Sequence, residues 1–205
     1  MDGIADAIML REHFGAVSSM AERKVLPRLD RHARAFISLS PLLVLASGDA
    51  DGNLDASPRG DAPGFVLILD DTTLLIPDRP GNNRIDTFGN VMSNPGVGII
   101  FFVPGIDETL RVNGRARVVT DAVLLEPAEA QGKTPRTGLV VTIGEVFFHC
   151  GKALKRSKLW DPARHVERSS FPTLGRIITE QTGGREADVP AADARLEEAY
   201  RTRLY

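Results

Sequence analysis

Short apolar runs alternate with polar turns from residue 41 to about residue 150, which is the pattern of a β-rich domain. The turns at 48–52 and 70–71 are short enough to join hairpins. Residues 97–103 are apolar on both faces and belong inside a sheet, whereas 109–119 alternates like a strand with one wet face. The runs expected as strands are 42–47, a stretch from Asn53, 65–69, 73–76, 97–103, 109–119 and 140–148. Six or more such strands predict an antiparallel barrel or sandwich.

The segments on either side of this core show helical spacing. Residues 2–38 are expected to be helical. A second helical segment, 30–39, carries Ala33, Phe36 and Ile37 on one face behind the N-cap Asp30. Further helices are expected at 82–92, around 122–126, directly after His149, and, beyond a polar linker at 182–188, over 191–203 with Leu196, Ala199 and Tyr200 inward. We therefore expect one domain of residues 1–205, made of an N-terminal helical extension (1–40), a β core (41–150) and a helical C-terminal segment (151–205).

The composition excludes several classes of protein. The 205 residues are 42% hydrophobic and 25% charged, with a net charge of −2, which gives no electrostatic reason to bind nucleic acid or an anionic membrane. The longest apolar runs fall far short of the ~20 residues that span a bilayer, and the acidic first residues do not resemble a signal peptide. Cys150 is the only cysteine, so no intrachain disulfide is possible and we expect a cytoplasmic location.

Two runs, 57–61 and 77–84, place arginine beside glycine and proline at the expected ends of strands. Arginine offers a planar fork of donors that suits a phosphate, and glycine and proline fix turns that bring backbone N–H groups close to an anion. The second run also opens the expected 82–92 helix, whose N-terminus attracts anions. Either run alone is typical of a polar turn. Together the two runs predict a grip on one phosphorylated cofactor.

A third run, 149–157, is rich in groups that could contact an anion or a flavin ring, with a basic, solvated helix start as the alternative. Cys150 has only His149 as a neighbouring base, and that side chain is expected to point elsewhere, so no catalytic residue is assigned. No metal site is expected either, because the histidines are scattered without ligand spacing, at His13, His32, His149 and His165. A Gly-Lys-Ser/Thr phosphate loop and a dinucleotide-binding glycine motif are both absent from the sequence.

The order of these motifs resembles a known family. The runs Leu-Ala-Ser, Asp-Gly, Ser-Pro-Arg-Gly-Asp, Ile-Pro-Asp-Arg-Pro-Gly-Asn-Asn-Arg, Asn-Pro-x-Val and Glu-Thr-Leu-Arg-Val-Asn-Gly follow one another as in the pyridoxamine 5'-phosphate oxidase-like flavoproteins. His-Cys-x-Lys-Ala (149–153) and Arg-Ser-x-Leu-Trp (156–160) resemble an uncharacterised bacterial branch of FMN-dependent enzymes. The resemblance covers about residues 35–160. It implies a mainly β, α+β fold, the FMN-binding split β-barrel with flanking helices.

The same resemblance implies an FMN at the interface of a homodimer. It places the FMN phosphate between a first set of residues, Ser57, Arg59, Gly60 and Asp61, and a second set, Asn82, Asn83 and Arg84. Ile76, Pro77 and Asp78 fall where the family lays its backbone along the isoalloxazine ring, and Thr109 falls where the oxidase has a glutamine near the ring. The partner subunit would contribute through His149, Lys152, Arg156 and Ser157.

Departures from the family pattern limit what the resemblance implies. The oxidase strand Arg-x-Val-Leu-Leu-Lys is replaced here by Ser-Pro-Arg-Gly-Asp-Ala, its Ser-Arg-Lys turn by Gly-Asn-Asn-Arg, and its C-terminal Arg-Leu-His-Asp-Arg is absent. An FMN-dependent oxidoreductase acting on an unidentified small molecule is implied, but vitamin B6 oxidation is not. Two alternatives stay open: a flavin-binding protein for storage, electron transfer or sensing, and a split barrel that binds another phosphorylated ligand or a haem.

Overall fold

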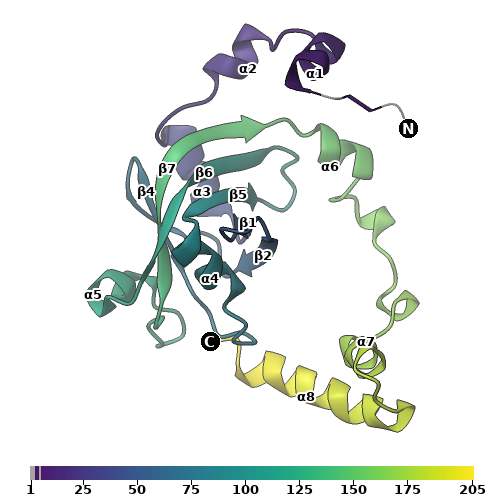
Figure 1. Cartoon of the computed structure of the whole chain (residues 1–205). Helices are drawn as coiled ribbons and strands as arrows, with labels where there is room; N and C mark the ends of the chain where they lie inside the picture. Colours follow the sequence, from purple (N-terminus) through teal and green to yellow (C-terminus); the bar gives the residue numbers. More distant parts are fainter. Residues whose placement is uncertain (1–2, 5) are drawn as a thin grey trace.

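The computed structural model describes residues 3–4 and 6–205 and is built around a seven-stranded antiparallel sheet (Figure 1). The strands lie in the order β2-β1-β5-β6-β7-β4-β3. Their bounds are β1 Leu42–Gly48, β2 Leu54–Gly60, β3 Leu67–Asp70, β4 Thr73–Pro77, β5 Gly96–Phe102, β6 Thr109–Val119 and β7 Gly138–His149. The expectation of six or more antiparallel strands is confirmed, and so is the interior place of β5, which lies between β1 and β6.

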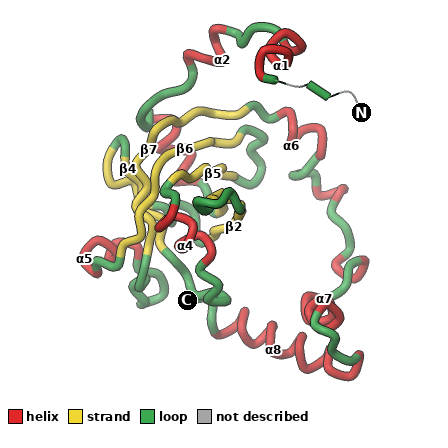
Figure 2. Tube along the Cα trace, in the orientation of Figure 1, coloured by secondary structure: helices red, strands yellow, loops and turns green. Residues whose placement is uncertain are grey.

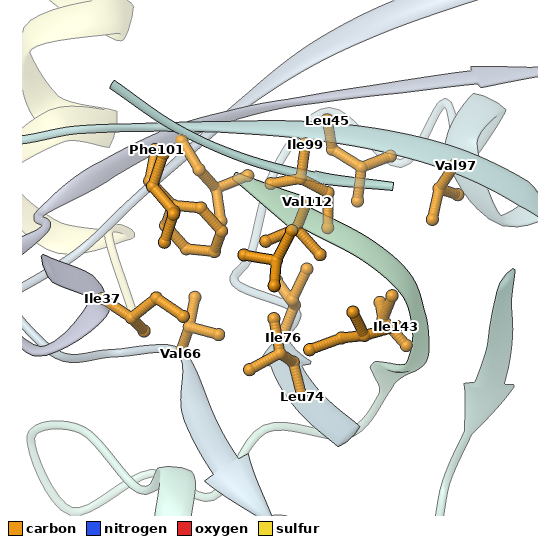
Figure 3. Packing of buried hydrophobic residues seen from close by; sticks show 14 of the residues in the cluster. Ile37, Leu45, Val66, Leu74, Ile76, Val97, Ile99, Phe101, Val112 and Ile143 are labelled. Carbon is orange, nitrogen blue, oxygen red and sulfur yellow. The ribbon is translucent and has the colours of Figure 1, made fainter. Parts of the chain in front are cut away.

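The sheet curls around a core that the alternating sequence pattern supplies, because successive strand residues point to opposite faces. Residues spaced two apart on β1, β5 and β6 are fully buried: Leu43, Leu45, Ile99, Phe101 and Val112. Leu74 and Ile76 of β4 pack into the same core (Figure 3). Strands β1 and β4, which are not neighbours in the sheet, therefore pack against each other through this core.

Helix α3 (Arg31–Leu39) packs on this core. The Asp30 carboxylate accepts the N–H of Ala33 at 2.8 Å, so the predicted N-cap is confirmed. Ala33, Phe36 and Ile37 are buried as predicted, and the Phe36 ring meets the Phe148 ring edge-on at 5.5 Å.

The N-terminal extension is less helical than expected for residues 2–38. Helices α1 (Ala7–Phe14) and α2 (Ser19–Arg23) are short, and Met1, Asp2 and Ala5 lie outside the described residues. Between α2 and α3 the chain is extended, because Leu26 exchanges backbone hydrogen bonds of 3.0 and 2.8 Å with Val146 of β7. This bridge to β7 explains why the residues around Leu26 are not helical as predicted. No helix of the described residues is long and apolar enough to cross a membrane.

Helix α4 connects β4 to β5 and helix α5 connects β6 to β7, and the predicted helices at both places are found. Their bounds are α4 Asp86–Ser93 and α5 Ala122–Leu125, and a 3₁₀ turn η1 follows at Glu126–Ala128. Helix α4 begins four residues later than expected, since residues 82–85 are not helical. This difference shapes the candidate site.

The C-terminal segment leaves the end of β7, runs outside the barrel and returns to it at Tyr205 (Figures 1 and 2). It contains α6 Lys152–Ser157, η2 Pro162–Arg164, η3 Arg168–Ser170, α7 Leu174–Gln181, η4 Glu186–Asp188 and α8 Val189–Thr202. Helix α7 was not predicted. It packs on α8 through Asp193, which accepts from the Thr173 hydroxyl at 2.9 Å and the Gly175 N–H at 3.1 Å. Tyr200 of α8 is 56% exposed, so the inward position expected for it is wrong.

Candidate functional site

Residues 57–60 are part of strand β2 and not the turn that the sequence suggested. Strand β2 lies at the edge of the sheet, where Pro58 is tolerated because an edge strand needs only half of its backbone hydrogen bonds. Alternation along the strand leaves Asp55, Ser57 and Arg59 half-buried on one face. That face forms one wall of a cavity.

Arg59 is held in this wall by three neighbours. Its guanidinium donates to the Asp78 carboxylate at 2.8 Å and to the Thr87 hydroxyl at 3.2 Å, and that hydroxyl donates to Asp55 at 3.1 Å. The Phe88 ring lies 5.9 Å from the guanidinium carbon. The buried Nε–H of Arg59 has no acceptor among the described residues. The Arg59 side chain thereby joins strand β2 to the end of β4 and to helix α4, and its Nε–H is left to donate to a ligand.

The loop before α4 has an unusual backbone. The Arg84 N–H donates to the Asn82 side chain at 3.1 Å, and Asn83 and Ile85 on either side of Arg84 have φ of 58° and 54°. A left-handed β-branched residue such as Ile85 is rare and strained. Ile85 is also the N-cap of α4 and gives no side-chain hydrogen bond. The first N–H groups of α4 are thus without a side-chain cap, an arrangement that favours an anion.

These two walls enclose a cavity of about 570 Å³, which we call the first cavity. Arg84 lies at its rim, 72% exposed, with its Nε–H 2.7 Å from the Asp86 carboxylate. That hydrogen bond raises the pKa of Arg84, so the guanidinium stays charged. The first cavity brings together eight of the predicted residues: Ser57, Arg59, Gly60, Pro77, Asp78, Asn82, Asn83 and Arg84.

Two predicted residues next to these, Ile76 and Asp61, do not line the first cavity. The Ile76 side chain is 2% exposed and packs in the barrel core, so only its backbone could face a ligand (Figure 3). The Asp61 side chain is 4% exposed and accepts from the Nε–H of Arg79 at 2.6 Å. Arg79 also donates to the Ala128 carbonyl at 3.0 Å. Asp61 therefore positions Arg79, and Arg79 rather than Asp61 lines the first cavity.

A second cavity of about 870 Å³, which we call the Tyr205 cavity, adjoins the first. The two share Asp78, Arg79, Pro80, Asn83, Ile85 and Phe88. Its other walls are Val118, Thr120, residues 133–137 and Tyr205. The Tyr205 hydroxyl donates to Asp61 at 2.5 Å, and the Lys133 ammonium donates to the main-chain oxygen of Tyr205 at 2.7 Å.

The pKa of the Tyr205 phenol depends on its hydrogen bond to Asp61. The hydrogen bond to the Asp61 carboxylate raises the pKa of the Tyr205 phenol, because losing the proton would set two negative charges together. Burial raises the pKa of Asp61, but hydrogen bonds from Tyr205, the Ala62 N–H and Arg79 outweigh it and lower that pKa. The contact is therefore stabilising between about pH 4 and pH 10, the ordinary pKa values of the two groups. It is lost as pH falls through the lowered value or rises through the raised one.

We expect Asp61→Asn to lower the pKa of Tyr205 toward its ordinary value of about 10. The measurement is a pH titration of tyrosinate absorbance in a Tyr200→Phe background, since the chain has only these two tyrosines. Asp51→Asn, which removes an exposed carboxylate from the β1–β2 turn, is the control. Equal midpoints for the Asp61 and Asp51 variants would mean that the phenol does not bind Asp61 in solution.

The remaining predicted residues form a separate group. Thr109 is the partner of His149 at one end of the β6–β7 ladder, and Lys152, Arg156 and Ser157 follow on α6. The other end of that ladder reaches Gly138, which pairs with Pro77 of the first cavity. None of the five lines either cavity in the described part of this chain.

Several residues of the site were not chosen from the sequence, namely Asp55, Arg79, Thr87, Phe88 and Tyr205. Asp55 could have been found, because it lies two residues before Ser57 on the same face of a strand. Thr87, 2% exposed, is a buried polar residue of an amphipathic helix, and such residues are usually hydrogen-bonded. Tyr205 gave no local signal, since its partner Asp61 is 144 positions away.

Comparison with known proteins assigns the barrel to a family. The family described as "Pyridoxamine 5'-phosphate oxidase" matches residues 29–150. No curated protein matches the chain.

Several solved structures share part of the fold. The HupZ protein of Group A Streptococcus is 21% identical, with a TM-score of 0.49 over 58% of this chain and 93% of its own. A putative pyridoxamine 5'-phosphate oxidase of Lactobacillus delbrueckii is 23% identical, with a TM-score of 0.47 over 60% and 95%. An FMN-binding protein of Syntrophomonas wolfei is 13% identical, with a TM-score of 0.46 over 58% and 84%. Likeness at this level leaves ligand and activity to be argued from the site.

Proposed function

Because the chain belongs to the pyridoxamine 5'-phosphate oxidase family, we propose that it is a cytoplasmic flavoprotein that binds FMN in the first cavity. We propose further that it is an FMN-dependent oxidoreductase acting on a small molecule. FMN would supply the redox chemistry, and the residues of the cavity would bind and orient it. The observation that carries the proposal is the uncapped, strained start of α4 beside Arg84.

The start of α4 suits a single terminal phosphate. Its free N–H groups, the partial positive charge of the helix and the Arg84 guanidinium converge on one side of the cavity. The Arg84–Asp86 pair is exposed, so a phosphate could share Arg84 with little desolvation. The left-handed Asn83 and Ile85 hold the loop open at a cost that ligand binding would offset.

The opposite wall suits the rest of the cofactor. Arg59 is fixed by Asp78 and Thr87 and retains one buried donor without an acceptor, which is a feature of sites completed by a ligand or water. Pro77, Phe65 and Phe88 add flat apolar surface to the same cavity. A flavin ring needs such a platform with a few polar groups around it.

We propose that the site is completed in a homodimer. Apolar side chains are exposed on both segments that leave the barrel, among them Ile8, Phe14 and Met20 at the N-terminal side and Val166, Phe171, Leu174 and Ile178 at the C-terminal side. A second copy would cover this surface. It could also supply His149, Lys152, Arg156 and Ser157, which this chain does not bring to its own cavities. Sedimentation should give a dimer at micromolar concentration, and a monomer with FMN bound would contradict this arrangement.

The test of FMN binding is an absorption spectrum recorded after adding FMN to the purified protein and desalting it. Retained flavin absorbance supports the site, and a colourless protein contradicts it. The oxidoreductase is then separated from a storage, electron-transfer or sensor protein by anaerobic mixing with reduced nicotinamide cofactors. Bleaching of the bound flavin supports turnover. Bound flavin that stays oxidised with these donors favours the non-catalytic alternative.

A further inference from the structure

The Tyr205 cavity is lined by a positively charged side chain, that of Arg136, which no carboxylate among the described residues of the cavity pairs with. Arg79 is paired with Asp61, and Asp78 is paired with Arg59. Lys133 donates to the main-chain oxygen of Tyr205. Arg136 has neither a hydrogen bond nor an ion pair with any described residue, although it lines the same cavity. The cavity therefore presents one free guanidinium, the group best suited to bind a carboxylate or phosphate in a bidentate manner.

The walls around this guanidinium are largely apolar and partly aromatic. Phe88 and Val118 line the cavity together with Pro80, Pro135 and the ring of Tyr205. The Phe88 ring is common to both cavities, so a molecule in the Tyr205 cavity would lie next to one in the first cavity. Flat apolar walls beside Arg136 select a ring-bearing anion over a strongly hydrated inorganic one.

Tyr205 is seated in this wall by three separate contacts. Its hydroxyl binds Asp61, its ring stacks with the Arg79 guanidinium at 5.6 Å, and its main-chain oxygen accepts from Lys133. These partners come from the end of β2, the β4–α4 loop and the β6–β7 connection. The C-terminal segment otherwise runs outside the barrel (Figure 1). These contacts fix the Tyr205 ring at one specific place in the wall of the Tyr205 cavity.

We propose that the Tyr205 cavity binds a small organic anion with a flat apolar body, recognised by Arg136 and enclosed by Tyr205 as a specificity-determining residue. This ligand is the substrate of the flavin chemistry, a part of the inference that rests on the proposed function. Binding itself requires only the cavity and is independent of FMN.

The test is calorimetric titration of the full-length protein, freed of FMN, with benzoate and with benzamide, its neutral counterpart of similar shape. We expect benzoate to bind at least about tenfold more tightly than benzamide, the factor for one charge-assisted hydrogen bond. Arg136→Gln should remove that preference and Arg136→Lys should keep part of it. Arg164→Gln, which removes an exposed arginine of η2 that does not line the cavity, should leave it unchanged.

Two variants of Tyr205 separate its ring from its hydroxyl. Tyr205→Ala should weaken benzoate binding several-fold and acetate binding little, because only benzoate has a ring to cover. Tyr205→Phe should bind benzoate nearly as well as the wild-type protein. A circular dichroism spectrum for each variant verifies that the barrel is folded.

Equal affinity for benzoate and benzamide, or an unchanged preference in Arg136→Gln, would overturn the proposal. These outcomes do not depend on the flavin, since FMN uptake is measured separately by absorbance. A protein that binds benzoate but no FMN would refute the proposed function and leave an anion site. A protein that binds FMN but shows no preference for benzoate would refute only this inference.

Discussion

Replacing Gly114 by alanine should destabilise the protein by about 3 kcal/mol, at the upper end of the cost of overpacking a tightly packed site. An added Cβ would lie 2.2 Å from the Thr142 carbonyl oxygen, 3.1 Å from its carbon and 3.3 Å from the Ile143 Cα. All three atoms are backbone of β7, so no side chain can rotate away. The ladder shifts register between Asn113 and Gly114, and a glycine inside a strand often marks such a bulge or a close approach of another backbone.

The measurement is urea unfolding of both the wild-type protein and the variant, followed by circular dichroism. A lower midpoint with an unchanged slope would report a loss of stability alone. Gly89→Ala is the matched control, because a Cβ there meets no atom within 4 Å and lies in helix α4. That change should be neutral or stabilising by up to about 1 kcal/mol. Equal midpoints for the Gly114 and Gly89 variants would show that β6 and β7 separate more easily than the structure implies.

This bulge also shows where a sequence pattern stops being informative. Alternation between apolar and polar residues predicted the strands, the interior place of β5 and the buried face of α3, because burial depends on local periodicity. The same pattern does not report register, and a bulge such as that at Gly114 shifts the pairing without altering composition. The position of the bulge could be seen only in the paired strands.

The start of α4 was predicted too early for a related reason. Residues 82–84 follow a Pro-Gly pair, a pattern that predicts a helix start, but the Asn82 side chain accepts the Arg84 N–H and holds a turn instead. Asparagine competes for backbone N–H groups in this manner. The backbone of the candidate phosphate grip therefore differs from the predicted one, because residues 82–85 form a turn and not the first turn of a helix. Asn82, Asn83 and Arg84 lie just before the uncapped start of the helix.

The contribution of Tyr205 could not be predicted at all. Its contacts with Asp61 and Lys133 span 144 and 72 positions of the chain, and no pattern in the C-terminal segment distinguishes a residue that docks from one that is solvated. Tyr200, five positions earlier, was expected to be inward and is exposed. Contacts of this range depend on the complete path of the chain, which local preferences do not determine.

Replacing Arg84 by alanine should weaken FMN binding by about 1.5–3 kcal/mol, the usual worth of a hydrogen bond to a charged group, or about tenfold or more in the dissociation constant. The Arg84 side chain is 72% exposed and its only ion pair is with Asp86 in the described residues, so the fold should lose little stability. Arg59→Ala should weaken binding at least as much. It would also destabilise the protein, because Asp78 loses its ion-pair partner in a half-buried wall and Thr87 keeps only its hydrogen bond to Asp55.

A variant that removes a negative charge tests whether the effect of the two arginine variants is specific to the start of α4. Asp86→Asn removes the carboxylate that competes with a phosphate for Arg84 at the start of α4. It should tighten FMN binding, because the helix dipole and Arg84 then act against one fewer negative charge, with Asp55 remaining beside Thr87. Fluorescence titration of FMN with the four proteins gives all the dissociation constants. Weaker binding in both arginine variants with tighter binding in Asp86→Asn would fix the phosphate at the start of α4. Unchanged affinity in Arg84→Ala and Arg59→Ala would place the cofactor elsewhere on the barrel.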